Sequence, residues 1–170
     1  KLLSGNEIKA FTGIFEGNNH VIRGAYVSID GNFAGIFGNS ETIQNLTIKD
    51  SYIKGGSGVG GIVGVLRNGG NIINCHNINT TVVGNEHAIG GIIGQYQGAE
   101  TSLISNCTNS GVVTSGGLGT GVSIATGGLV GSFVNGTIRD CINFGGVTAN
   151  GNNVGGIIGH TDAAATTNVI

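Results

Sequence analysis

The residues best suited to chemistry in this 170-residue chain are three cysteines, Cys75, Cys107 and Cys141, which lie 32 and 34 residues apart. Three thiols can bind a metal ion, two can join in a disulfide, or all can stay reduced as small buried side chains. Zinc sites typically use paired Cys or His at short spacing, such as Cys-x-x-Cys, and this sequence has no such pair. We therefore predict no metal site and favour buried, reduced thiols, with an incidental disulfide as the alternative.

The histidines and acidic residues form no catalytic motif in the sequence. A zinc protease needs two His on one helical turn with a Glu between them, whereas Glu86-His87 is only an adjacent pair. Glycan-cleaving enzymes need paired carboxylates. The acids are scattered, at Glu16, Asp30, Glu41, Asp50, Glu86, Glu100, Asp140 and Asp162. We therefore predict no catalytic residue and no cofactor, although stacking of distant acids keeps a glycan-active enzyme open as an alternative.

A short apolar segment between glycines recurs five times and indicates a repeat fold. Its copies begin 26, 30, 37 and 28 residues apart, which is the period of a solenoid. The copies are 34–38, 60–64, 90–94, 127–131 and 155–159. We interpret each copy as one strand.

Two further elements recur between these copies. The first has the form Ile-x-Asn/Asp-Cys/Leu, at 43–46, 72–75, 104–107 and 138–141. The second is a short β-branched run, at 51–55, 81–84, 111–114 and 145–148. The chain has 22 Ile and 15 Val against 7 Leu, and no Pro that would remove a donor from a strand ladder. We therefore predict an all-β fold, a parallel β-helix (β-solenoid) of about five rungs with three short strands per rung. We expect residues 1–170 to be one such domain, cut from a longer protein.

Stacking places equivalent residues of successive rungs over one another, about 4.8 Å apart. This predicts an internal column of Leu46, Cys75, Cys107 and Cys141. It also predicts an asparagine ladder at a corner, made of Asn77, Asn109 and Asn143. Both columns are interpreted as structural.

The repeat pattern resembles a known family. Residues 104–113, Ile-Ser-Asn-Cys-Thr-Asn-Ser-Gly-Val-Val, together with the glycine segments, resemble the GLUG motif of bacterial surface proteins, and residues 11–22 resemble the segment that often precedes GLUG arrays. The resemblance implies a secreted or cell-surface, adhesin-like protein, or the non-catalytic part of an immunoglobulin A1 protease of the M26 metallopeptidase type. Leu46 in place of Cys and Asp140 in place of Asn depart from the pattern.

Charge and hydropathy limit the classes of partner that this chain can bind. The net charge is −2 and only 9% of residues are charged, so the sequence lacks the basic footprint of a nucleic-acid-binding protein. No apolar run is long enough to cross a membrane. We predict a non-catalytic stalk or adhesin-like scaffold whose partner is a host glycan or an extracellular protein, with end-to-end stacking of copies as a further association. Loops at 83–88 and 116–126 are expected to carry the specificity.

Overall fold

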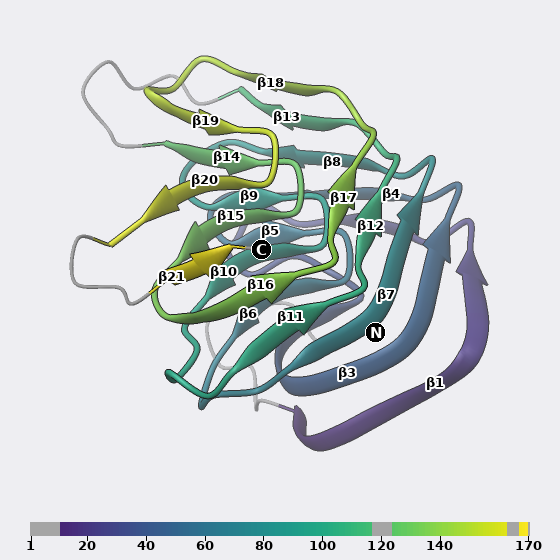
Figure 1. Ribbon diagram of the computed structural model, residues 1–170. Coiled ribbons are helices and arrows are strands. Elements are labelled where there is room, and N and C mark those ends of the chain that lie inside the picture. Colours follow the sequence, from purple (N-terminus) through teal and green to yellow (C-terminus); the bar gives the residue numbers. More distant parts are fainter. Residues whose placement is uncertain (1–10, 117–123, 163–166, 170) are drawn as a thin grey trace.

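The chain folds as a parallel β-solenoid of about five turns. The computed structural model describes residues 11–116, 124–162 and 167–169, and these residues contain strands and connecting segments but no helix. Figure 1 shows the coils stacked one beside the next, from β1 (Phe11–Arg23) in purple to the yellow strands at the C-terminal end. The predicted all-β, parallel architecture is therefore confirmed.

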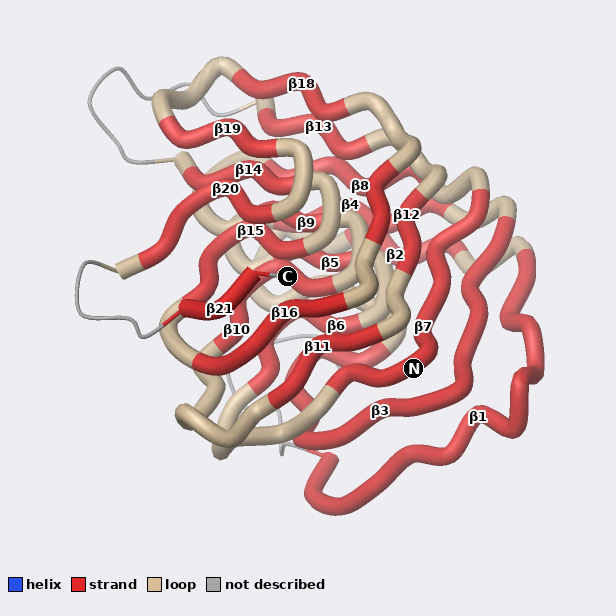
Figure 2. The backbone as a smooth tube through the Cα atoms, in the orientation of Figure 1, coloured by secondary structure: helices blue, strands red, loops and turns tan. Residues whose placement is uncertain are grey.

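The strands form three parallel sheets, shown as red segments in Figure 2. The largest sheet has the order β20 (Ile158–Thr161), β15 (Val130–Phe133), β10 (Ile93–Tyr96), β6 (Val63–Leu66), β3 (Phe37–Lys49), β7 (Ile72–Ile78), β11 (Leu103–Ser105), β16 (Gly136–Arg139) and β21 (Thr167–Val169). Three more strands belong to it, since β1 pairs with β3, and β12 (Thr108–Asn109) pairs with β7 and β17 (Ile142–Asn143). The second sheet has the order β18 (Val147–Ala149), β13 (Val113–Ser115), β8 (Thr81–Gly84), β4 (Tyr52–Gly55) and β2 (Tyr26–Ser28). The third has the order β19 (Asn153–Gly155), β14 (Ala125–Gly127), β9 (Ile89–Gly90) and β5 (Val59–Gly60).

The largest sheet covers two sides of the solenoid because β3 pairs with a different strand at each end. Residues 37–40 of β3 pair with β6, whereas residues 43–49 pair with β7. Residues 41–42 lie between these two partners, so the two halves of β3 lead into two separate stacks of strands. One stack continues through β10, β15 and β20, and the other through β11, β16 and β21.

The Gly-Gly-Ile segment forms a corner rather than a continuous strand. In the second full coil, β5 ends at Gly60, a bend covers Gly61 and Ile62, and β6 begins at Val63. A Cβ at Gly61 would collide with the carbonyl oxygen of Gly91 in the next coil. A coil therefore has one strand more than the sequence predicts, because glycine lets the backbones of adjacent coils meet closely at this bend.

The interior is a column of small and medium aliphatic side chains. Most of the buried core consists of Ile and Val, and successive coils place like residues on like, as in the register of Val63, Ile93, Val130 and Ile158. Tyr96 and Phe133 stack in the same way, with ring centroids 5.0 Å apart and planes 7° from parallel. At roughly 25 cal/mol per Å² of apolar surface removed from water, this repeated burial stabilises every coil against its neighbours.

Candidate binding groove

The predicted cysteine column runs along the second stack of strands. Leu46 lies in register with Cys75, and the pairs Ser105↔Ile73 and Thr108↔His76 on either side place Cys107 over Cys75. The Cys107 N–H donates a hydrogen bond of 3.4 Å to Cys141 Sγ. Cys75 and Cys107 are fully buried, whereas Cys141, in the last full coil, is half-buried.

The environment makes two of these thiols poor nucleophiles. All three cysteines are free, and burial raises the pKa of the Cys75 thiol to about 12. The pKa of the Cys107 thiol is raised as well, first by a side-chain hydrogen bond between the Cys107 and Cys141 thiols and then by burial. The same hydrogen bond lowers the pKa of Cys141, because it stabilises the thiolate there. Nucleophilic chemistry needs an accessible thiolate, which Cys75 and Cys107 do not offer.

The predicted asparagine column lies inside the solenoid. Asn77 and Asn109 are fully buried, and Asn109 lies in register between Asn77 and Asn143. Asn109 Nδ2 donates to Asn143 Oδ1 at 2.9 Å and to Gly111 O at 3.0 Å, while Gly111 N donates to Asn109 Oδ1 at 3.1 Å. The side chain thus satisfies the backbone of the corner that follows it.

The inner asparagines also explain the second glycine of three Gly-Gly pairs, at Gly61, Gly91 and Gly128. A Cβ at Gly91 would lie 2.5 Å from Asn109 Cγ, and a Cβ at Gly61 would lie 2.9 Å from Asn77 Nδ2. Asn77 Nδ2 donates to Gly91 O at 2.8 Å. The two sequence motifs, distant along the chain, therefore pack on each other across the core.

The structure contains a second asparagine column, on the outer surface, that was not predicted from the sequence. Asn45, Asn74 and Asn106 precede the column of Leu46 and the cysteines, and all three have left-handed backbone with φ of 57°, 51° and 52°. Asn74 Nδ2 donates to Asn45 Oδ1 at 2.8 Å, and Asn106 Nδ2 donates to Asn74 Oδ1 at 2.9 Å. The signal was present in the sequence, since Asn is the residue type that tolerates this conformation best after Gly.

Glu16 accepts hydrogen bonds at the N-terminal end of this outer column. Asn45 Nδ2 donates to both carboxylate oxygens, at 2.9 and 3.1 Å, the Asn18 N–H donates at 2.8 Å, and Gln44 Nε2 donates at 2.7 Å. These donors lower the pKa of Glu16, with Asn45 contributing most. The carboxylate is fully exposed, so we interpret it as the end of a polar ladder.

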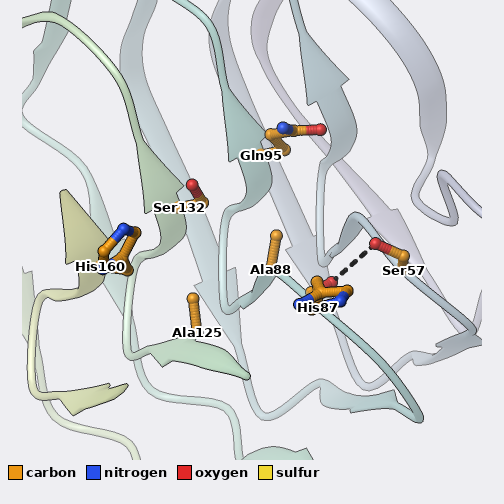
Figure 3. Close-up of a pocket in the computed structure, with 7 residues that line it drawn as sticks. All are labelled: Ser57, His87, Ala88, Gln95, Ala125, Ser132 and His160. Atoms are coloured by element: carbon orange, nitrogen blue, oxygen red, sulfur yellow. Dashed lines mark hydrogen bonds between the residues drawn. The ribbon is translucent and has the colours of Figure 1, made fainter. Parts of the chain in front are cut away.

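A groove opens on the outside of the solenoid, between the first stack of the largest sheet and the segments that lead into the third sheet. Its volume is about 290 Å³. Seven residues line the groove, namely Ser57, His87, Ala88, Gln95, Ala125, Ser132 and His160. Figure 3 shows them in two rows from different coils.

Stacking of the coils produces both rows. Gln95, Ser132 and His160 are in register on β10, β15 and β20. On the other side, His87 and Ala88 precede β9 and Ala125 begins β14. The first row therefore repeats one position of the coil, and the second repeats two adjacent positions.

The groove offers hydroxyl, amide and imidazole groups above a small apolar floor. Ala88 and Ala125 are each 4% exposed, and Ser57 Oγ donates to the His87 carbonyl oxygen at 3.1 Å. His160 Nε2 lies 3.7 Å from Asp162 Oδ1. None of the seven lining residues is Asp or Glu, so the lining itself lacks the carboxylate pair of a glycoside hydrolase. In the part of the chain that the structure describes, no cluster of three or more His, Cys, Asp or Glu side chains could hold a metal ion.

Residues from both loops expected to carry specificity line the groove. His87 and Ala88 both belong to the predicted loop at 83–88. Most of the other predicted loop, at 116–126, lies outside the described residues, although Ala125 at its end lines the groove. Within the described ranges, no helix has the length and hydropathy needed to cross a bilayer.

The fold and the groove define a parallel β-solenoid repeat protein with a groove on its outer surface. Residues 85–114 match the GLUG motif, so the resemblance to GLUG-motif proteins is confirmed. The chain is 40% identical over 91 residues to halomucin of Haloquadratum walsbyi, a match that covers 51% of this chain and 1% of halomucin. A Bacteroides ovatus crystal structure, provisionally named an immunoglobulin A1 protease, is 28% identical with a TM-score of 0.78, covering 98% of this chain and 51% of that one. The chain therefore spans a very small part of halomucin and about half of the Bacteroides ovatus structure.

Proposed function

We propose that this chain is a non-catalytic repeat module of a secreted or surface-displayed protein, and that it serves as a rigid scaffold carrying an adhesin-like binding surface. The observation that supports this best is the unbroken pairing of strands from coil to coil. In the largest sheet, β6, β10, β15 and β20 pair in sequence, while β5, β9, β14 and β19 do the same in the third sheet. Each coil is thereby fixed to the next by backbone hydrogen bonds and by packing.

The GLUG match and the likeness to halomucin support a place outside the cell, since the resemblance associates this repeat with surface proteins. Antibodies against the chain should label intact cells of the organism that produces it, and brief protease treatment of those cells should remove the label. Labelling that appears only after the cells are lysed would contradict the proposal.

The scaffold role has its own measurement. Stretching the chain between its ends in a force spectrometer should show resistance along the axis and stepwise loss of coils, because each coil contacts only its neighbours. A control protein of similar length with an up-and-down helical bundle should extend at lower force. If the solenoid extends at the same low force as the helical bundle, the scaffold role is wrong.

A second candidate role is the accessory part of a metallopeptidase that cleaves immunoglobulin A1, and the likeness to the Bacteroides ovatus structure favours it. In that setting the solenoid would hold the substrate or position a separate catalytic domain. Incubation with immunoglobulin A1 should give saturable binding without cleavage. Absence of binding would leave the scaffold role as the better account.

A glycan-active β-helix enzyme is the third alternative. It predicts that the chain releases reducing or unsaturated ends from neutral or acidic polysaccharides, with or without Ca²⁺. A panel of polysaccharides that yields neither product would remove this alternative.

A further inference from the structure

Phe33 occupies, in the first coil, the position that lines the groove in later coils. The Phe33 N–H donates to Ser57 O at 2.7 Å, and the Gly58 N–H donates in the same way to His87 O at 2.8 Å. These matching bonds make Phe33, Gly58 and Ala88 equivalent residues of three successive coils. Ala125 extends the row, because Thr126 is in register with Ile89.

The backbone at this position is the same in three of these four coils, whereas Ala125 lies in strand β14 and is not left-handed. Phe33, Gly58 and Ala88 have φ values of 62°, 63° and 57°, in the left-handed region. A bulky residue rarely adopts this conformation, so Phe33 is held there by its surroundings. The coils of Phe33, Gly58 and Ala88 thus differ in the side chain at this position and not in the path of the chain.

The Phe33 ring covers the groove region of the second coil. A Cβ at Gly58 would lie 2.7 Å from Phe33 Cδ1, so the ring rests where Gly58 leaves room. The Arg67 guanidinium lies 5.6 Å from the centroid of the ring. Val65, at the position of Gln95 one coil earlier, is fully buried although it lies outside the core cluster, which fits the cover that the ring provides.

Ala88 and Ala125 provide no ring in the later coils, and there the surface is hollowed to about 290 Å³. Phe33 therefore acts as an internal guide to what fits: a six-membered ring at the position that Ala88 and Ala125 leave open in later coils. The residues that line the groove come from four successive coils, which span about 14 Å at roughly 4.8 Å per coil.

We propose that the groove binds a pyranose ring of a neutral glycan. A pyranose presents apolar C–H groups on its faces, which match Ala88 and Ala125, and hydroxyls around its edge. Ser57, Gln95 and Ser132 line the same space with groups that donate and accept hydrogen bonds. This inference rests on the binding part of the proposed function and names the class of ligand.

An aromatic side chain of a protein partner fits the groove less well. It would match the apolar floor but would cover the hydroxyl and amide groups of the rim without hydrogen-bonding to them, which costs free energy. An acidic sugar would gain little, because no Lys or Arg lines the groove. A neutral pyranose can contact the apolar floor and also form hydrogen bonds with the polar rim.

The test uses the full chain and four immobilised probes: cellotetraose, mannotetraose and N,N′,N″-triacetylchitotriose as neutral saccharides, and tetragalacturonate as an acidic one. A Phe-containing peptide is the fifth probe. Binding is measured by biolayer interferometry. Saturable binding to at least one neutral saccharide, stronger than to tetragalacturonate and the peptide, is the expected result.

Two variants locate the binding. Ala88→Phe places the Phe33 side chain on a backbone of the same φ and should weaken binding about tenfold or more by filling the groove. Thr114→Phe adds the same ring to β13 in the second sheet, away from the groove, and should leave binding unchanged. Ser132→Ala, which adds no bulk, should weaken binding about fivefold and keeps the test valid if Ala88→Phe fails to fold.

Three results would overturn the inference: no binding to any neutral saccharide, binding to the peptide or tetragalacturonate alone, or full binding by both Ala88→Phe and Ser132→Ala. In each of these cases the force measurement and the cell-surface labelling stand unaffected. Failure of the glycan site is therefore distinguishable from failure of the scaffold role.

Discussion

Replacing Asn109 by Ala should destabilise the solenoid far more than the same change at Asn77, although both side chains are fully buried. Asn109 makes three hydrogen bonds, two to the backbone of Gly111 and one to Asn143. Asn77 makes one, to Gly91 O, and its Oδ1 is buried without a partner. The loss of packing is similar in the two variants, so the hydrogen bonds decide the difference.

The magnitude follows from this count. Each hydrogen bond contributes about 1 kcal/mol net, and a buried group left without its partner costs about 1 to 3 kcal/mol. Asn109→Ala should therefore lower the free energy of unfolding by about 3 to 5 kcal/mol. Asn77→Ala removes one bond together with an unsatisfied acceptor and should cost about 1 to 2 kcal/mol. The expected difference of about 2 kcal/mol or more is large against a typical total stability of 5 to 15 kcal/mol.

Guanidinium unfolding followed by far-ultraviolet circular dichroism measures both variants against the parent chain. The slope of the free energy with denaturant has to stay the same for the comparison to hold, because a changed slope signals a changed extent of unfolding. If Asn77→Ala proves as costly as Asn109→Ala, the asparagine column stabilises the fold by packing alone and the hydrogen-bond account is wrong.

Three further predictions concern the glycines, the thiols and Glu16. Gly91→Ala should lower the free energy of unfolding by about 3 kcal/mol because its Cβ meets a backbone carbonyl oxygen, whereas Gly146→Ala, with open space around it, should change it by less than about 0.5 kcal/mol, both measured by the same denaturation. At pH 8 a thiol reagent should label Cys141 in the folded chain well before Cys107, which is buried and has a raised pKa, and denaturant should abolish this order; equal rates would contradict the column. Because the pKa of Glu16 is depressed in the folded state, its hydrogen bonds stabilise the fold above the unfolded pKa and are lost as pH falls through the folded pKa, so the stability gap between the parent and Glu16→Gln should close in acid; a gap that stays constant from pH 7 to pH 3 would show that Glu16 is not linked to folding.

Much of the architecture could be predicted from the sequence because a parallel ladder forces equivalent residues into register. The spacing of Cys75, Cys107 and Cys141 and the recurrence of glycine segments both follow from that constraint. The corner at Gly61 and Ile62 could not, since a glycine-bounded apolar run suits a strand as well as a bend. The choice depends on the backbone of the next coil, which only the three-dimensional stack supplies.

The groove was beyond sequence reasoning for a related reason. It depends on the equivalence of Phe33, Gly58, Ala88 and Ala125, which belong to three residue types and follow connections of different length. Motif alignment finds the columns that are repeated, such as Asn77 and its equivalents, but not the columns in which the residues differ. The backbone hydrogen bonds between coils show which residues are equivalent where the residue types differ.

Columns that point inward determine the stability of the solenoid, whereas columns that point outward determine what it recognises. An inward position such as Asn109 has to match the coil on each side, so its residue type recurs and its loss spreads to neighbouring coils. An outward position such as Ala88 has to be compatible only with the left-handed backbone. Its side chain can therefore differ from one coil to the next, as Phe33 and Ala88 do. Ala88→Phe should therefore weaken binding about tenfold or more with little effect on the free energy of unfolding. Asn109→Ala should lower the free energy of unfolding but leave binding unchanged under conditions where the chain is still folded. A single variant that removed both properties in equal measure would mean that the groove and the core are one energetic unit, and that the outer surface of this solenoid is not an independent site for recognition.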